Sequence, residues 1–186
     1  MMALAREPEP SFIEVDITKM RRRHLRRVLS IEARVYPRPW SASLFLSELA
    51  QRSTRSYIVA RSEAEVVGYA GMMFTGLEAH ITNIAVDPTF HGRKIGSRLL
   101  LTLITEAIAR GAESVSLEVR VSNLAAQAMY ERFGFVVVGT RKGYYIETKE
   151  DAFVMVAEGT GSTDYRLRLA RIRNEIDELR EGFVDE

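Results

Sequence analysis

The spacing of hydrophobic positions changes its period several times along the chain, and each change marks an expected element. Apolar or alternating runs rich in Val, Ile and Tyr predict strands at 12–16, 56–61, 66–75, 80–86, 114–120, 135–138 and 152–156. A polar turn at 62–65 joins the second and third of these runs into a β-hairpin. The strand pattern is therefore spread over most of the chain.

Apolar residues at helical spacing predict helices at 18–34, 41–51, 96–110 and 123–133. Thr18 and Ser41 are suited to cap the first two, while Gly111 and Gly134 end the last two. The prolines within Tyr36–Trp40 must break the first helix. Together these elements predict an α/β fold, with a mixed, mostly antiparallel central sheet of about six to seven strands and helices on both faces.

The C-terminal segment differs in kind, because one apolar stripe runs along an otherwise charged helix. The stripe consists of Tyr165, Leu169, Ile172, Ile176, Leu179 and Phe183. Such a stripe must dock on something, either on the chain's own sheet or helices or on a second copy in a homodimer. We therefore divide the chain into a flexible leader at 1–11, one α/β domain at 12–158 and a C-terminal helical extension at 159–186.

Composition narrows the class of protein. Apolar residues make up 46% of the 186 positions and the formal net charge is +1, so the balance of charge does not predict direct nucleic-acid recognition. The absence of cysteine excludes a thiol nucleophile, and three scattered histidines make no metal site, so no metal is expected. No apolar run is long enough to span a membrane, and the first ten residues lack the apolar core of a signal peptide. A cytoplasmic protein is the expectation.

An anion-binding site is indicated where the strand ending in Ile84–Val86 leads through a basic loop into the helix from Gly96. The first amides of a helix have no intrahelical partner, and Arg93, Lys94 and Arg98 add positive charge around them. A pyrophosphate would suit this arrangement. A helix start with solvated basic residues is the alternative.

Several motifs occur in one order along the chain. They are His80-Ile-Thr-Asn-Ile-Ala-Val-Asp-Pro88, His91-Gly-Arg-Lys-Ile-Gly-Ser-Arg-Leu-Leu100, Ser116-Leu-Glu-Val-Arg-Val-Ser-Asn123, Ala128-Met-Tyr-Glu-Arg-Phe-Gly-Phe135, Arg141-Lys-Gly-Tyr-Tyr145 and Glu150-Asp-Ala-Phe-Val-Met155. This set resembles the GNAT acetyltransferases and, within them, the RimI-like ribosomal-protein-alanine N-acetyltransferases. Pro39-Trp40-Ser41 is similar to that branch as well. The resemblance spans about residues 12–157.

The resemblance implies acetyl-CoA as the co-substrate, held where neighbouring central strands splay apart. The backbone of the strand would pair with the pantetheine arm, Asn123 would hydrogen-bond that arm, and the loop would hold the phosphates. The implied binding residues are Ile84, Ala85, Val86, His91, Gly92, Arg93, Lys94, Ile95, Gly96, Ser97 and Asn123. The chain departs from the family pattern where Lys94 replaces a glycine and His91 replaces Gln or Arg, which bears on how tightly the cofactor is held.

The resemblance also implies that Glu118 is the general base and Tyr130 the general acid for the leaving thiolate. An α-amine needs only a modest base, but a carboxylate is weak for this task unless burial raises its pKa. The alternative for Glu118 is an ion pair with Arg120 or another basic neighbour, and for Tyr130 a packing role in the core. We favour the catalytic roles.

For the acceptor, the resemblance implies a protein or peptide N-terminus, such as that of a ribosomal protein. Trp40 and Tyr145 are expected to line the site of this acceptor. Adjacent residues on a strand face opposite ways, so only one of Tyr144 and Tyr145 can do so, and we choose Tyr145. A lysine side chain or a small amine is the alternative acceptor, and a non-catalytic acyl-CoA binder is the alternative class. His80 is expected to be structural. The arginines of 21–27 are expected to form a solvated face, with ribosomal RNA or an acidic substrate as the alternative partner.

Overall fold

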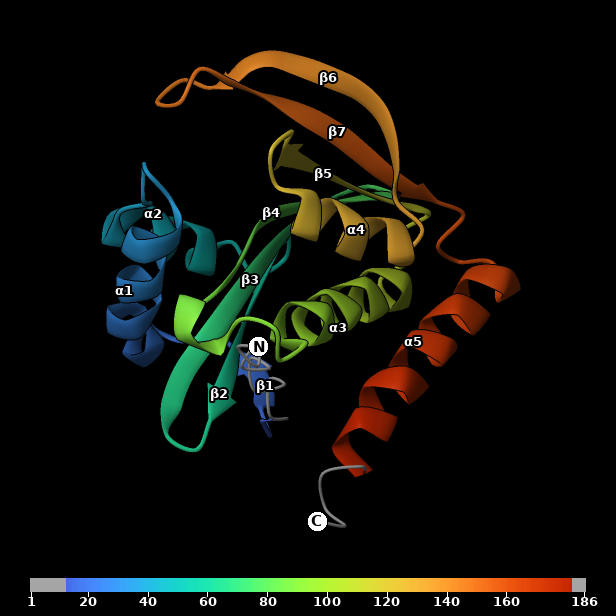
Figure 1. Cartoon of the computed structure of the whole chain (residues 1–186), viewed down its shortest axis with the longest axis horizontal. Coiled ribbons are helices and arrows are strands. Elements are labelled where there is room, and N and C mark those ends of the chain that lie inside the picture. Colours follow the sequence, from blue (N-terminus) through green and yellow to red (C-terminus); the bar gives the residue numbers. More distant parts are fainter. Residues whose placement is uncertain (1–12, 182–186) are drawn as a thin grey trace, which may run out of the picture.

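A computed structural model describes residues 13–181 and the side chains as far as residue 178. Its centre is a seven-stranded sheet in the order β1-β2-β3-β4-β5-β7-β6, visible in Figure 1. The strands are β1 (Asp16–Lys19), β2 (Arg55–Ser62), β3 (Glu65–Thr75), β4 (Glu78–Val86), β5 (Ser114–Arg120), β6 (Val136–Tyr145) and β7 (Glu150–Glu158). The α-helices are α1 (Leu25–Val35), α2 (Ala42–Ala50), α3 (Ile95–Ala109), α4 (Leu124–Arg132) and α5 (Thr163–Glu181). The mixed α/β fold predicted from the sequence is confirmed.

Among the strands of residues 13–181, the seam between β4 and β5 is the one parallel pairing, and the other neighbouring strands pair antiparallel. The two strands pair only from Glu78–His80 against Ser114–Ser116, although β4 continues to Val86 and β5 to Arg120. Beyond the paired residues the strands separate, so backbone groups on the facing edges are left without a ladder partner. The splayed central strands expected from the resemblance are therefore present.

Two apolar clusters cover the two faces of the sheet. On β2, Ile58 and Ala60 belong to the cluster under α3, while Tyr57 and Val59 belong to the cluster under α1 and α2. This alternation follows from the period of two of a β-strand. The helices thus lie on both faces, and Figure 1 shows β6 and β7 arching beyond α4 on the far side of the seam.

The beginning of the chain differs from the sequence expectation. The first described strand is β1 at Asp16–Lys19 rather than 12–16, and Phe12 lies outside the described residues. Thr18 is paired with Val59 in the sheet, so it does not cap a helix. A 3-10 turn, η1 at Arg22–His24, leads into α1. Sheet pairing has overridden a local capping signal here, which is the usual outcome when tertiary contacts oppose propensity.

The remaining predicted elements are present, and the largest changes of length are in the last two strands, of which β7 runs from Glu150 to Glu158 instead of 152–156. Ser41 caps α2 by accepting from the Leu44 N–H, and α3, β5 and α4 match their predicted bounds within about one residue. The strand expected at 135–138 runs from Val136 to Tyr145 because it pairs with β7 along most of that length. Its polar, exposed residues do not show the alternation of a half-buried strand, so the pattern understated it.

The C-terminal helix docks on the chain itself. Tyr165, Leu169, Ile172 and Ile176 are buried in the cluster that contains α3, and the Tyr165 hydroxyl donates to the Phe133 carbonyl at 2.8 Å. The first of the two expected partners for the stripe, the chain's own helices, is therefore confirmed at these positions, while Phe183 and the side chain of Leu179 lie outside the described part. Within that part, no helix is both long and apolar enough to cross a membrane.

Candidate active site

The free edge of β4 carries backbone carbonyls that point into the seam. Asp87 N–H bonds the Val67 carbonyl of β3, and the alternation of an antiparallel ladder then turns the backbone groups of Ile84 and Val86 away from β3. Two side chains reach these carbonyls: the Tyr36 hydroxyl donates to Ile84 O at 2.9 Å, and His91 Nε2 lies 3.0 Å from Val86 O. Because a carbonyl only accepts, the His91 nitrogen must donate. The open edge of β4 therefore presents carbonyl groups that could bind an added strand, and in the free protein two side chains already donate to them.

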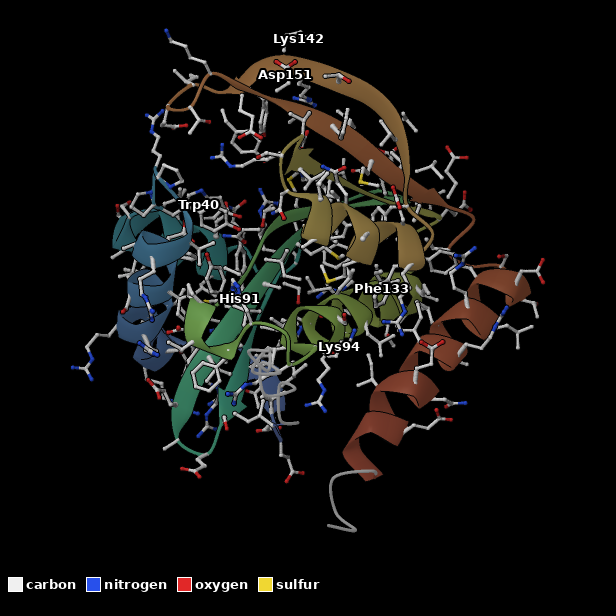
Figure 2. The ribbon with its side chains drawn as sticks, viewed as in Figure 1. Trp40, His91, Lys94, Phe133, Lys142 and Asp151 are labelled. Atoms are coloured by element: carbon white, nitrogen blue, oxygen red, sulfur yellow. The ribbon has the colours of Figure 1, made fainter. Side chains whose placement is uncertain are left out.

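The loop before α3 has the geometry of an anion cradle. Lys94 is the N-cap residue of α3 and lies in the left-handed region with φ 57°, and Gly92 also has a positive φ of 78°. Among the described residues, no side chain caps the first amides of α3. Figure 2 shows His91 and Lys94 on this loop, on the same side of the molecule as the start of α3. Lys94 thus adopts the backbone conformation for which glycine is usual, at a steric cost of about 1–2 kcal/mol.

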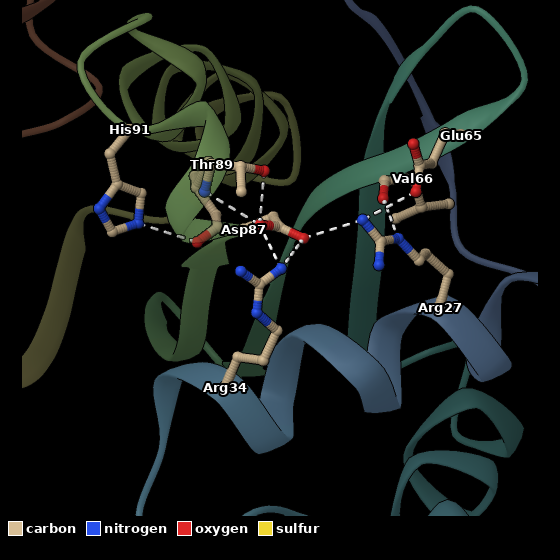
Figure 3. Close-up of polar contacts among 8 residues, drawn as sticks. Arg27, Arg34, Glu65, Val66, Asp87, Thr89 and His91 are labelled. Carbon is tan, nitrogen blue, oxygen red and sulfur yellow. Dashed lines mark hydrogen bonds and ion pairs between the residues drawn. The ribbon is translucent and has the colours of Figure 1, made fainter.

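A buried carboxylate fixes the start of this loop. Asp87 is fully buried and accepts from Arg34 Nη1 at 2.7 Å, Arg27 Nη2 at 2.8 Å and the Thr89 N–H at 3.0 Å (Figure 3). Burial alone would raise the pKa of Asp87, but the hydrogen bonds from Thr89 and the charges of Arg34 and Arg27 hold it below its ordinary value. Arg27 is therefore not part of the solvated face expected from the sequence. The exposed arginines of that segment are Arg21, Arg22, Arg23 and Arg26.

Glu118 on β5 is held by basic residues from two other strands. His80 Nε2 on β4 lies 3.1 Å from Oε2, Arg141 Nη2 on β6 lies 3.1 Å from Oε1, and the Glu118 side chain is 9% exposed. The hydrogen bond from His80 holds the pKa of Glu118 below its ordinary value; burial opposes this, and the nearby charges of His80 and Arg141 add to it. The rise in pKa that a lone carboxylate base requires is therefore absent. The basic neighbours are His80 and Arg141, not Arg120.

Three tyrosines from distant parts of the chain influence one another beside the seam. Tyr130 on α4 is 5% exposed, and burial raises its pKa, with a further contribution from Tyr145. Burial likewise raises the pKa of Tyr36, and Tyr130 is the next contributor. Each hydroxyl therefore stays protonated at neutral pH and can donate a hydrogen bond.

Tyr145 connects this group to Glu118. Burial raises the pKa of Tyr145 to about 12, the charge of Arg120 opposes the rise, and Glu118 is among the groups that add to it. Arg120 lies with its guanidinium carbon 3.7 Å from the Tyr145 ring centroid and pairs with Glu150 at 3.0 Å. The structure thus brings Tyr145 into the neighbourhood of both residues that the sequence singled out for catalysis.

Asn123 is the N-cap residue of α4. Its side-chain oxygen accepts from the Ala126 N–H at 3.2 Å, which leaves the amide NH₂ group to face another partner. The side chain is exposed. The position is compatible with a hydrogen bond to the arm of a bound coenzyme.

The loop between α1 and α2 carries Trp40, which the sequence predicted as a wall of the acceptor site. Trp40, labelled in Figure 2, donates its backbone N–H to Glu32 Oε1 at 2.9 Å. The centroids of its ring and the Phe45 ring are 5.3 Å apart. Glu32 is buried, its Oε2 has no partner in the described structure, and burial raises its pKa to about 7. Arg38 in the same loop lies 3.8 Å from Glu147 in the β6–β7 turn. An ion pair therefore links the loop that carries Trp40 to the turn that follows Tyr145.

The sequence did not predict four contacts of the site. They are Tyr36 with the Ile84 carbonyl, His80 and Arg141 with Glu118, and Asp87 with Arg27 and Arg34. His80 and Glu118 meet only because β4 and β5 pair in one register, and no local pattern encodes that register. Asp87 is the exception, since an Asp-Pro step after a strand with Thr two residues later is a recognisable capping signal.

The chain is similar to known proteins over most of its length. A profile of the acetyltransferase (GNAT) family matches residues 25–135. The chain is 40% identical over 147 residues to N-alpha-acetyltransferase RimI of Mycobacterium tuberculosis, which covers 76% of this chain and 90% of that protein. It is 36% identical over 127 residues to the [ribosomal protein bS18]-alanine N-acetyltransferase of Escherichia coli (strain K12), covering 67% and 84%. The crystal structure of the ribosomal-protein-S18-alanine N-acetyltransferase from Escherichia coli superposes with a TM-score of 0.72 at 32% identity, over 78% of this chain and 94% of that one.

Proposed function

The chain belongs to the acetyltransferase (GNAT) family and is an N-acetyltransferase that uses acetyl-CoA, and from this premise we propose that it acetylates the N-terminal α-amine of a protein. Relatives named for that activity align along most of their length, and the name of the Escherichia coli relative suggests a ribosomal protein as the acceptor. We place the reaction in the cytoplasm. The observation that carries the proposal is the position of Glu118 on β5, just beyond the residues paired with β4, where His80 and Arg141 each lie 3.1 Å from one of its carboxylate oxygens.

Acetyl-CoA fits the seam in two parts. Its pyrophosphate would take the uncapped amides of Ile95–Ser97 and the charge of Lys94, because a helix start with a left-handed cap residue presents N–H groups to an anion. Its pantetheine amides would pair with Ile84 and Val86 as an added strand, with Asn123 beside them. In the free protein, Tyr36 and His91 occupy the carbonyls that the pantetheine amides would bind.

The reaction needs one proton to leave nitrogen and one to reach sulfur. The acceptor amine forms a bond to the thioester carbonyl carbon, its N–H proton passes to the base at Glu118, the carbon–sulfur bond breaks, and the thiolate accepts a hydrogen bond or proton from the Tyr130 hydroxyl. The raised pKa of Tyr130 makes it a neutral donor that stabilises developing thiolate charge, rather than a strong acid.

The proposal is tested by following coenzyme A release with peptides that begin with Ala, Ser, Gly, Met or Lys, against N-terminally blocked peptides with one internal lysine. Turnover with free N-termini, strongest for Ala or Ser, supports the proposal. Turnover with only the blocked lysine peptides would assign a side-chain acetyltransferase, and turnover with none of them a small-amine enzyme.

Two variants test the assigned roles. Tyr130→Phe should bind acetyl-CoA with unchanged affinity and lose about 10- to 100-fold in kcat, because it removes one hydrogen-bond donor to the leaving group. Glu118→Gln should lose about 100-fold or more in kcat/KM. Full turnover by Tyr130→Phe with normal binding would contradict the role given to Tyr130.

A further inference from the structure

His80 occupies a position that a purely structural histidine would not need. It is the last β4 residue paired with β5, at the point where the seam opens, and its side chain is 29% exposed. Both ring nitrogens are engaged: Nε2 lies 3.1 Å from Glu118 Oε2 and Nδ1 lies 2.9 Å from Ser116 Oγ. Ser116 and Glu118 alternate with the buried residues Val115 and Leu117 on β5, so all three polar groups share the face turned away from α3.

The carboxylate of Glu118 is poorly placed to keep a proton by itself. Each of its oxygens already faces a cationic or hydrogen-bonding group, His80 on one side and Arg141 at 3.1 Å on the other. A proton added to either oxygen would weaken one of these contacts. A charged carboxylate in this setting is suited to hold a cation next to it.

We infer that His80 is the group that finally takes the proton from the attacking amine, and that Glu118 acts through it by holding the resulting imidazolium. This inference rests on the proposed function, since it refines how that reaction loses its proton. For the resting state we assign His80 Nε2–H as the donor to Glu118 and the Ser116 hydroxyl, which also lies 3.5 Å from the Ala79 carbonyl, as the donor to Nδ1 at 2.9 Å. As the amine attacks, its N–H bond breaks and the proton bonds to Ser116 Oγ, while the Ser116 proton moves to Nδ1.

This arrangement has the balance of charge that the step requires. The added proton makes the ring an imidazolium whose Nε2–H faces the Glu118 carboxylate and whose Nδ1–H faces Ser116. The other charged or titratable groups beside His80 and Glu118 come from β6. Arg141 contacts the second carboxylate oxygen of Glu118, and the pKa of Tyr144 is raised mainly by burial and further by the charge of Glu118.

The first test is kinetic and uses His80→Gln, because the glutamine amide can still donate to Glu118 but cannot accept a proton. Initial rates with an alanyl peptide are measured between pH 6 and about 9.5. The inference predicts a loss of about 100-fold or more in kcat/KM near pH 7, a KM for acetyl-CoA within twofold of wild type, and a loss that shrinks toward high pH where solvent can remove the proton. His24→Gln is the control and should keep the wild-type profile, because His24 is a buried histidine at the N-terminal end of α1, the end opposite Tyr36.

The result that overturns the inference is a His80→Gln profile within threefold of wild type at every pH, since Glu118 alone would then suffice. This outcome is distinct from failure of the proposed function, which would appear as no turnover of any α-amine by the wild-type protein.

A second test needs no turnover. ¹⁵N NMR of the histidine rings, with His80 assigned from the missing signal in His80→Gln, reports which nitrogen carries the proton in the neutral ring. The inference predicts a proton on Nε2 and a free Nδ1. A neutral ring protonated on Nδ1 would overturn it, because that nitrogen could then accept nothing from Ser116.

Discussion

The Tyr36 hydroxyl donates a hydrogen bond of 2.9 Å to the carbonyl of Ile84, from the end of α1 to the open edge of β4. That carbonyl is one of the two that an added strand would use. The free protein therefore satisfies part of its own binding edge, and a coenzyme arm must replace or share this contact.

Tyr36→Phe should show separately how that contact affects protein stability and how it affects acetyl-CoA binding. Loss of the hydroxyl should lower the free energy of unfolding by about 1 kcal/mol and tighten acetyl-CoA binding by about two- to tenfold, because no resident donor competes for the carbonyl. Calorimetric titration and urea unfolding measure both quantities. Tyr165→Phe is the matched control, since its hydroxyl donates to the Phe133 carbonyl at 2.8 Å outside the seam. Equal effects of the two variants on acetyl-CoA affinity would contradict the competition.

Lys94→Gly tests the phosphate loop. Relief of the left-handed backbone offsets the entropy of the added glycine, so stability should rise by about 0–1 kcal/mol. Affinity for coenzyme A should fall by about two- to fivefold with the lost charge. Lys149→Gly is the matched control, because Lys149 has the same sign of φ, 54°, in the β6–β7 turn. A Lys94→Gly protein that binds coenzyme A as tightly as this control would show that the Lys94 charge plays no part.

Asp87→Asn should destabilise the protein by about 1–3 kcal/mol, because it removes charge-assisted hydrogen bonds from Arg27 and Arg34. The pKa of Asp87 is lowered in the folded state, so its stabilising effect is present above the unfolded pKa and is lost as the pH falls below it. The difference in melting temperature between wild type and variant should therefore narrow below about pH 4. A difference that stays constant into acid would rule out the ionised carboxylate as its source.

Glu32→Gln should stabilise the protein, whereas Asp87→Asn should destabilise it. Burial raises the pKa of Glu32 from 4.5 to about 7, so wild-type stability falls as the pH rises through that interval and levels off above it. The glutamine oxygen can still accept from the Trp40 N–H. The variant should therefore melt higher than wild type at pH 8 and show a smaller gain at pH 5. A gain that is the same at both values would assign the effect to packing instead of charge.

The sequence predicted the features that depend on local pattern. The Ser41 cap, the helix that begins beside Lys94 and the strand of Glu118 lie where capping residues and periodicity placed them. The failures have one cause, pairing between distant segments. Thr18 joined the sheet opposite Val59, and β6 extended along β7 through residues with no alternating pattern.

The same limit applies to the site. The resemblance supplied Glu118 and Tyr130, but the contacts that modify them come from strand register and loop packing. His80 is 38 positions from Glu118 in the chain, and Arg141 reaches the carboxylate from β6. No spacing rule links these residues. The pKa of Glu118 therefore moves in the direction opposite to the one that a lone base requires.

The central claim is that the acceptor nitrogen is an α-amine. The most direct measurement is tandem mass spectrometry on one peptide that begins with alanine and carries a single internal lysine, after incubation with the protein and acetyl-CoA. The account predicts one added acetyl group, located on the fragment ions that contain the N-terminal alanine. An acetyl group found only on the lysine fragment would contradict the account.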